Sequence, residues 1–257
     1  MDQGKRNGSV ASALASVVAG LLLCAPAVAQ GPAVADCQVP IEYVHDNSPL
    51  PSLEAALRAP ETTRIVAIGS ASMAGMGASA PAKSYAERFL ATFQDRMQHA
   101  ATLDNKAARS MSVSDWLPRI EREVMAGKPA LVLWEAGTVD AVRGVDTVEF
   151  ARMLSEGVHL MKQAGADVLL IDPLFSKRTT TMLNLRPYID AMKAVAIAEN
   201  LVFFDRLEIM KFWFESGYFK FADKPDAAMM AENDRIFDCL GRLLTVTVER
   251  SVKLKAR

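Results

Sequence analysis

The sequence predicts a three-layer α/β/α sandwich around a five-stranded parallel sheet. Four apolar runs show no alternation with polar residues, which is typical of strands buried on both faces of a parallel sheet, and a fifth run is weaker. Amphipathic stretches with apolar residues at helical spacing separate these runs. Several of the stretches close with Gly or Asn, as helices often do at their C-terminal ends. The repeated strand–helix order indicates right-handed crossovers.

The predicted strands are, in chain order, "RIVAIGS", "ATLDN", "ALVLWEAG", "ADVLLIDP" and "LVFFD". The predicted helices between and after them are "SYAERFLATFQDRM", "SDWLPRIEREVMAG", "VEFARMLSEGVHLMKQAG", "RPYIDAMKAVAIAEN" and a last helix that contains "FDCLGRLL". Ligands of such sheets bind beyond the carboxyl ends of the strands, so the loops that follow the strands are where functional residues are expected.

Composition restricts the class of protein. The chain has 257 residues, of which 51% are hydrophobic and 23% are charged, and this composition suits one large buried core. The formal net charge is -1, and basic residues are scattered among acidic ones. No basic stripe is present, so nucleic acid is not expected as a partner.

The first residues predict a cleavable signal peptide, residues 1–29. Two basic residues precede an apolar run that ends in small residues, and signal peptidase accepts this pattern. Cleavage is expected between Ala29 and Gln30, with a weaker second site at Ala35. The alternative is an uncleaved membrane anchor, because the run approaches spanning length. With cleavage, the protein is expected to be periplasmic or secreted and to have no membrane span.

Residues 30–63 predict an N-terminal arm over the domain surface, with one short helix at "LEAALR", and residues 64–250 predict the main domain. Export would leave Cys37 and Cys239 as a pair in an oxidising compartment, so a disulfide between the arm and the last helix is expected. The alternative is two unpaired buried thiols. No metal site is expected, because the pair has no nearby histidine or third cysteine.

Four blocks of sequence resemble the SGNH/GDSL hydrolase family. "AIGSASMAGMGASAPAKSYAERF" looks like the first block, "LDNKAARSMSVSDWL" like the second, "LVLWEAGTVDAVRG" like the third, and the stretch before "FDCLGRLL" like the last. The resemblance covers about residues 62–248. It implies a flavodoxin-like strand order and hydrolysis or transfer of an ester-linked acyl group without metal or organic cofactor. In the family, the blocks supply a nucleophilic serine, a glycine backbone donor, an asparagine donor and an Asp-x-x-His pair.

The residues at the matching positions depart from the family's chemistry. Ala71 falls at the nucleophile position, and an alanine cannot attack a carbonyl. Ser110 falls near the glycine donor, where a backbone N–H could still serve. The third block falls on Gly137, Thr138, Val139 and Asp140, so valine replaces the asparagine donor. The resemblance therefore implies a cleft with an incomplete oxyanion hole.

The family's base is also absent from its usual place. The chain has three histidines, His45, His99 and His159, and none lies in the C-terminal region. Asp226 or Asp223 could match the family's aspartate. The position expected for histidine holds Met229 or Ala231, depending on where a small gap is placed.

Two functions follow from this pattern. In the first, the protein is a degenerate member, a pseudoenzyme that binds an acylated polysaccharide or an envelope protein partner in the cleft. In the second, Ser70 or Ser72 acts as the nucleophile of an esterase or acyl transferase. Serine needs a general base for this role, and Asp140, Asp172 and Asp226 are the candidates.

Several of these residues also have purely structural interpretations. Ser70 and Ser72 could cap a helix or satisfy loop backbone groups. Asp140 could cap the helix that follows the third strand, and Arg143 could bind a ligand or pair with Asp140 or Asp146. The aromatic segment "FWFESGYFKF" suggests a platform for stacking carbohydrate, or else packing of a helix and turn on the sheet.

Overall fold

The computed structural model describes residues 36–44, 48–221 and 227–253, all within the unit formed by residues 31–257. The predicted signal peptide, His45 and the two aspartates of the last block, Asp223 and Asp226, lie outside the described residues. Within the described residues, no helix is both long and apolar enough to cross a membrane.

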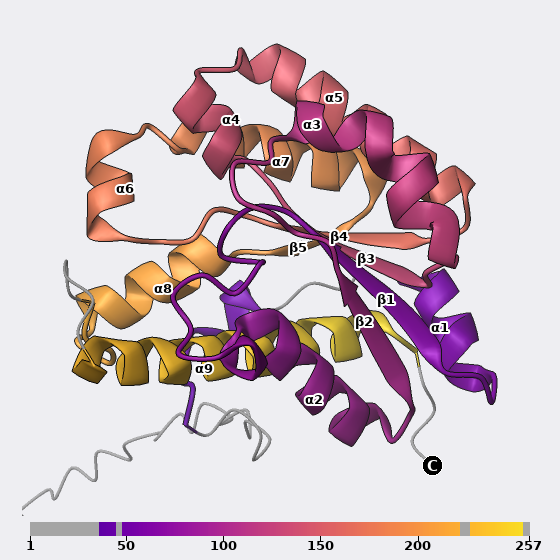
Figure 1. Ribbon diagram of the computed structural model, residues 1–257, viewed down its shortest axis with the longest axis horizontal. Helices are drawn as coiled ribbons and strands as arrows, with labels where there is room; N and C mark the ends of the chain where they lie inside the picture. Colours follow the sequence, from indigo (N-terminus) through magenta and orange to yellow (C-terminus); the bar gives the residue numbers. More distant parts are fainter. Residues whose placement is uncertain (1–35, 45–47, 222–226, 254–257) are drawn as a thin grey trace, which may run out of the picture. The chain divides into compact units, whose positions relative to one another are not determined.

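The five expected strands form one parallel sheet with the order β2-β1-β3-β4-β5. Their bounds are Thr63–Ile68 (β1), Ala101–Asn105 (β2), Leu131–Glu135 (β3), Asp167–Ile171 (β4) and Val202–Phe204 (β5). This flavodoxin-like order confirms the predicted fold class. The carboxyl ends of the strands all point to the same edge of the sheet (Figure 1).

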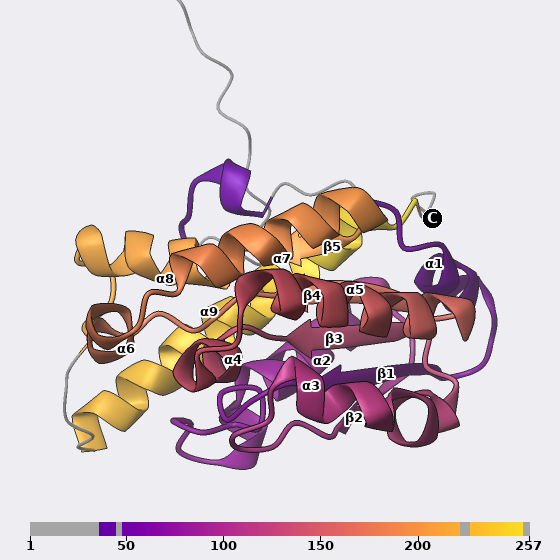
Figure 2. The ribbon, with the colours of Figure 1, turned by 90° about the horizontal axis from the view of Figure 1, so that it is seen from above.

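Helices cover both faces of the sheet (Figure 2). Side chains alternate along β1, so that Ile65 and Ala67 pack with one helical layer while Val66 and Ile68 pack with the other. The first layer contains α1 (Pro51–Arg58), α2 (Tyr85–Met97), α8 (Arg206–Glu215) and α9 (Ala227–Ser251). The second contains α3 (Val113–Trp116), α5 (Thr147–Gln163) and α7 (Arg186–Glu199). Two short helices, α4 (Thr138–Arg143) and α6 (Lys177–Met182), follow β3 and β4.

Local sequence signals set several helix ends. The Ser84 side chain precedes α2 and accepts a hydrogen bond from the backbone N–H of Glu87. Asp146 does the same at the start of α5, where it accepts from two backbone N–H groups. Asn200 ends α7 in the left-handed region with φ of 54°, as its position after the amphipathic stretch indicates.

The predicted helix over 114–127 is wrong as a single element. The segment instead forms the short α3, a 3-10 turn over Leu117–Arg119, a π-type turn over Ile120–Val124 and a further 3-10 turn. Pro118 is the physical reason, because proline lacks a backbone N–H and its ring clashes with the preceding turn of an α-helix. The apolar face still packs on the sheet through residues such as Trp116 and Ile120.

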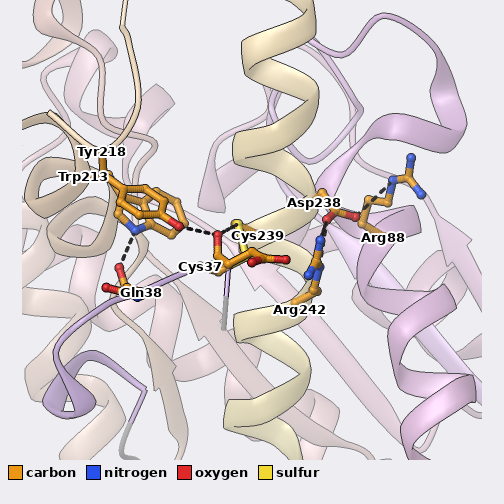
Figure 3. The surroundings of a disulfide bond; sticks show 9 residues. Cys37, Gln38, Arg88, Trp213, Tyr218, Asp238, Cys239 and Arg242 are labelled. Carbon is orange, nitrogen blue, oxygen red and sulfur yellow. Dashed lines mark hydrogen bonds and ion pairs between the residues drawn. A yellow bond between two sulfur atoms is a disulfide. The ribbon is translucent and has the colours of Figure 1, made fainter. Parts of the chain in front are cut away.

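The N-terminal arm is joined to the rest of the domain by the predicted disulfide, Cys37–Cys239, which the structure contains (Figure 3). Two further bonds hold the same stretch. The Trp213 indole N–H donates to the carbonyl of Gln38 at 2.9 Å, and the Tyr218 hydroxyl donates to the carbonyl of Asp36 at 2.5 Å. The arm is thus fastened to α8, to the turn that follows it, and to α9.

Helices α2 and α9 approach each other closely at Gly241. A Cβ atom added there would lie 2.6 Å from the backbone nitrogen of Phe89 and 2.6 Å from the Cβ of Arg88. Backbone atoms of a packed helix cannot move aside easily, so only a residue without a side chain allows this contact.

The variant Gly241→Ala should therefore lose stability, by about 1 to 3 kcal/mol, although alanine is intrinsically the better helix former. Urea unfolding followed by circular dichroism measures this loss. Gly127→Ala is the matched control, because its added Cβ would meet only the end of the Arg64 side chain, at 3.8 Å. Equal unfolding midpoints for the two variants would contradict the packing argument.

Candidate functional site

A cluster of polar side chains lies at the carboxyl edge of the sheet, where function was expected. Ser70 and Ser72 follow β1, Glu135 is the last residue of β3, Tyr85 is the first residue of α2, and Arg206 is the first residue of α8. We call these five residues the Glu135 cluster. Because parallel strands end at one edge, residues far apart in the chain meet here.

The Glu135 carboxylate is the centre of the cluster and accepts from all four other side chains. The Ser70 hydroxyl donates to Oε1 at 2.6 Å, and the Ser72 hydroxyl lies 2.7 and 2.8 Å from the two oxygens. The Tyr85 hydroxyl donates to Oε2 at 2.7 Å, and Nη1 of Arg206 donates to the same oxygen at 2.9 Å. Both side chains of the ion pair are buried, with exposed fractions of 0% for Arg206 and 1% for Glu135.

The charge of Glu135 is retained in spite of its burial. Burial by itself raises the pKa of a carboxyl, but the Arg206 charge and the hydrogen bonds from Ser70, Arg206 and Ser72 outweigh it and lower the pKa of Glu135. The pKa of Tyr85 is raised well above its ordinary value, first by burial and then by the Glu135 charge. Glu135 is therefore ionised and Tyr85 is protonated at neutral pH.

This arrangement makes the two serines hydrogen-bond donors to a weak base. A general base works best when its pKa lies near the operating pH, whereas the pKa of Glu135 lies below the ordinary glutamate value of 4.5. The carboxylate can hold both hydroxyl protons in hydrogen bonds without removing either. Ala71, which the sequence resemblance matches to the nucleophile position, lies between the two serines and carries only a methyl group.

The loop after β1 comes very close to Glu135 because of Gly69. Its φ is +152°, and an added Cβ would lie 2.6 Å from the Glu135 Cβ and 2.9 Å from the Glu135 carbonyl oxygen. Only glycine permits both the backbone angle and the contact. Gly69 thus places Ser70 and Ser72 within reach of the carboxylate.

The carboxylate that bonds the two serines is Glu135 and not one of the three predicted aspartates. Oδ1 of Asp172 accepts from the backbone N–H of Leu207 at 2.9 Å, and no bond joins Asp172 to either serine in the described part of the chain. Asp140 also bonds elsewhere, and Asp226 lies outside the described residues. Sequence reasoning missed Glu135, although an acidic residue that ends a wholly apolar strand was a signal that could have identified it.

The second and third blocks are joined by Asp140, which confirms a structural role for this side chain. Its Oδ1 accepts from the backbone N–H of Val113 at 3.1 Å, and its Oδ2 accepts from the N–H of Gly137 at 3.3 Å. Asp140 is buried, whereas Val139 beside it is half-buried and adds no hydrogen-bonding group. Ser110 is exposed, and its φ of 62° lies in the region that glycine adopts most readily. That backbone angle fits its match to the family's glycine.

Arg143 does not pair with Asp140 or Asp146. Its guanidinium forms an ion pair with Asp115 at 2.8 Å and donates to the Ser112 hydroxyl and the Ser110 carbonyl, both at 2.8 Å. Of the two alternatives for Arg143, the pairing with Asp140 or Asp146 was wrong, because the N-terminal residues of α3 face α4 in the fold and bring Asp115 closer. Arg143 therefore supports the loop that carries Ser110.

The described histidines are placed away from the cluster. His99 contacts the Glu61 carbonyl at 3.1 Å, and His159 pairs with Glu199 at 2.7 Å. Met229, one of the two residues that could match the family's histidine, is buried near the start of α9, and the other, Ala231, is exposed. The β1 loop is tied to this part of α9, because the backbone N–H of Ser79 donates to Asp234 at 2.9 Å. The first and last blocks therefore meet as the family's layout implies.

A family model described as the Non-GDSL lipase-like family matches residues 36–254, which is most of the chain. Among curated protein sequences, none matches.

Solved structures of hydrolases share the fold. The lipase/acylhydrolase from Enterococcus faecalis is 19% identical with a TM-score of 0.60, over 76% of this chain and 100% of that one. LAE5, an alpha/beta hydrolase enzyme from the metagenome of Lake Arreo, Spain, is 18% identical with a TM-score of 0.56, over 73% and 99%. A mutant of Axe2, an acetyl-xylooligosaccharide esterase from Geobacillus, is 19% identical with a TM-score of 0.52, over 70% and 94%. At such identities the likeness is one of fold.

Proposed function

This chain belongs to the Non-GDSL lipase-like family, and from that premise we propose that it is an exported binding protein. In this proposal the chain no longer catalyses ester hydrolysis, and it binds an acylated glycan in its cleft. The observation that carries the proposal is the Glu135 cluster. Ala71 stands at the nucleophile position, and the hydroxyls on either side of it donate to a buried, ionised carboxylate.

Three substitutions act together against turnover. Without the serine there is no acyl-enzyme, and without the asparagine one oxyanion donor is lost, which costs about 3 kcal/mol of transition-state stabilisation in enzymes where it has been measured. Without the histidine no base accepts the serine proton, and such assistance contributes roughly 10² to 10⁴ in rate. The positions concerned are Ala71, Val139 and, for the histidine, Met229 or Ala231.

Two observations support the ligand and the compartment. Axe2, one of the structural neighbours, is an acetyl-xylooligosaccharide esterase, which supports an acylated sugar as the ligand class. The Cys37–Cys239 disulfide fits an oxidising compartment, as does the apolar N-terminal run.

Labelling with a fluorophosphonate probe tests the loss of catalysis. The purified chain should take up no probe by intact mass, because neither serine is activated. The triple variant Ala71→Ser/Val139→Asn/Met229→His should be labelled and should hydrolyse p-nitrophenyl acetate faster than the parent, by roughly 10² or more.

Stoichiometric labelling of the parent chain that disappears in Ser70→Ala or in Ser72→Ala would overturn the proposal in favour of an active esterase. Calorimetry with acetylated and deacetylated xylo-oligosaccharides tests the ligand, and equal affinity for the two would contradict an acyl-dependent cleft.

A further inference from the structure

A groove of about 730 Å³ lies beside the disulfide and is lined by residues of α2, of α9, of the turn after α8 and by Asp36 of the arm. Its volume falls within the range of small-molecule sites, roughly 300 to 1,000 Å³. None of the residues of the Glu135 cluster lines it, so it is a separate feature of the domain. Among the described residues, the lining contains four basic side chains, Lys83, Arg88, Arg235 and Arg242, and three acidic ones, Asp36, Asp234 and Asp238.

Two of these basic residues are neutralised by partners of their own. Lys83 lies 3.2 Å from Asp234, and Arg235 lies 2.7 Å from Glu232. Arg88 and Arg242 remain, and the acidic residues of the lining that remain with them are Asp238 and Asp36.

Arg88 and Arg242 share one carboxylate, Asp238 (Figure 3). Nε of Arg88 lies 3.7 Å from one Asp238 oxygen, and Nε of Arg242 donates to the other at 2.8 Å. One carboxylate cannot neutralise two guanidinium groups. In the described part of the chain, Nε of Arg88 is also buried without a hydrogen-bond partner. The three side chains are about one-third exposed, so an anion in the groove can reach them.

A tyrosine ring stands at the same groove. Tyr218 is 37% exposed, and its hydroxyl is fixed to the Asp36 carbonyl beside the disulfide. Its ring packs edge-on against Phe219 with centroids 4.9 Å apart. A fixed and partly exposed aromatic ring offers a flat apolar face at little cost in conformational entropy. The C–H face of a pyranose ring is complementary to such a surface.

We propose that this groove binds a carboxylated saccharide, an oligosaccharide that contains uronic acid. Arg88 and Arg242 hold the carboxylate, because guanidinium groups match its planar, bidentate geometry. The Tyr218 ring stacks on a neighbouring sugar. The site does not depend on the proposed function of the cleft, since it uses other residues on another part of the domain.

Calorimetry of the purified, oxidised chain with trigalacturonate tests the proposal, with maltotriose as the neutral sugar. Trigalacturonate should bind at least tenfold more tightly than maltotriose at low salt, and its affinity should fall as salt is added. Arg242→Gln leaves Asp238 paired with Arg88 and removes one of the two guanidinium groups that hold the saccharide's carboxylate, so it should weaken binding about tenfold, a change typical of one charge-assisted contact. Tyr218→Ala should also weaken it. Arg186→Gln, an exposed arginine on α7 paired with Asp190, should leave affinity unchanged.

Equal affinity for trigalacturonate and maltotriose would overturn the proposal, as would unchanged affinity in both Arg242→Gln and Tyr218→Ala. If inorganic phosphate binds as tightly as trigalacturonate, the groove is an anion site only and the saccharide assignment is wrong. Thermal unfolding of each variant, followed by circular dichroism, shows whether the variant is folded. A loss of binding counts only in a folded variant.

Discussion

Replacing Arg206 by methionine should lower the free energy of unfolding by about 3 to 5 kcal/mol at neutral pH, the usual cost of leaving a buried charge without its partner. Glu135 and Arg206 are both buried, and their charged atoms lie 2.9 Å apart. In the variant, the carboxylate keeps only the hydroxyl donors of Ser70, Ser72 and Tyr85. Urea unfolding followed by circular dichroism at pH 7 measures the difference.

Two further variants separate the buried charge from other effects of the change. Arg152→Met removes an exposed arginine of α5 that pairs with two glutamates, and it should leave the unfolding midpoint unchanged. The double variant Arg206→Met/Glu135→Leu should recover much of the loss, because an apolar pair no longer buries an uncompensated charge. A double variant less stable than Arg206→Met would contradict this account.

The loss should depend on pH in one direction. In the parent chain the folded pKa of Glu135 lies below its ordinary value of 4.5. Its contribution to stability is therefore present above about pH 4.5 and is lost as the pH falls through the lower folded value. Without Arg206, burial dominates and the variant binds a proton more readily when folded. The stability difference between parent and variant should shrink as the pH falls from 7 toward 4, and a constant difference would contradict the ionised Glu135.

Removing the disulfide should also lower the free energy of unfolding by a large amount. Cys37 and Cys239 are 202 residues apart in sequence, so the bridge restricts a very large loop of the unfolded chain. The double variant Cys37→Ser/Cys239→Ser should lose about 2 to 5 kcal/mol of unfolding free energy. Urea unfolding measures the loss, and the reduced parent chain should unfold at a midpoint close to that of the variant.

The intact mass of the parent chain provides the control, because reduction should add two hydrogens to a chain with a single bridge. A reduced and an oxidised parent with the same unfolding midpoint would contradict a stabilising role for the bridge. Because Cys37 lies beside Asp36 and Gln38, whose carbonyls accept from Tyr218 and Trp213, reduction should also loosen these two contacts.

The irregular segment after β2 shows that a local signal can be overlooked. Pro118 was visible in the sequence and explains why 114–127 does not form one helix. The apolar spacing dominated the interpretation, and it correctly indicated which side packs on the sheet. The Arg143 partner was a different case, since Asp115 becomes its neighbour only when α3 packs beside α4.

The sequence by itself determined the layers, the strands and which residue types stand where the four blocks resemble the SGNH/GDSL hydrolases. Strands buried on both faces must be apolar along their whole length, so "ALVLWEAG" and "ADVLLIDP" can be identified as strands from the sequence alone. The absence of a hydroxyl at Ala71, of an amide at Val139 and of any histidine after His159 are likewise facts of composition.

Only the tertiary structure decided what the remaining polar residues do. Glu135 is 65 residues from Ser70 and 71 from Arg206, and nothing local in the sequence indicates that the three touch. They meet because parallel strands deliver their carboxyl ends to one edge, and because Gly69 lets the β1 loop approach Glu135 within contact distance. Hydrogen bonds and ion pairs act over a few ångströms in space, whereas the hydrophobic pattern of a strand is a property of consecutive residues in the sequence.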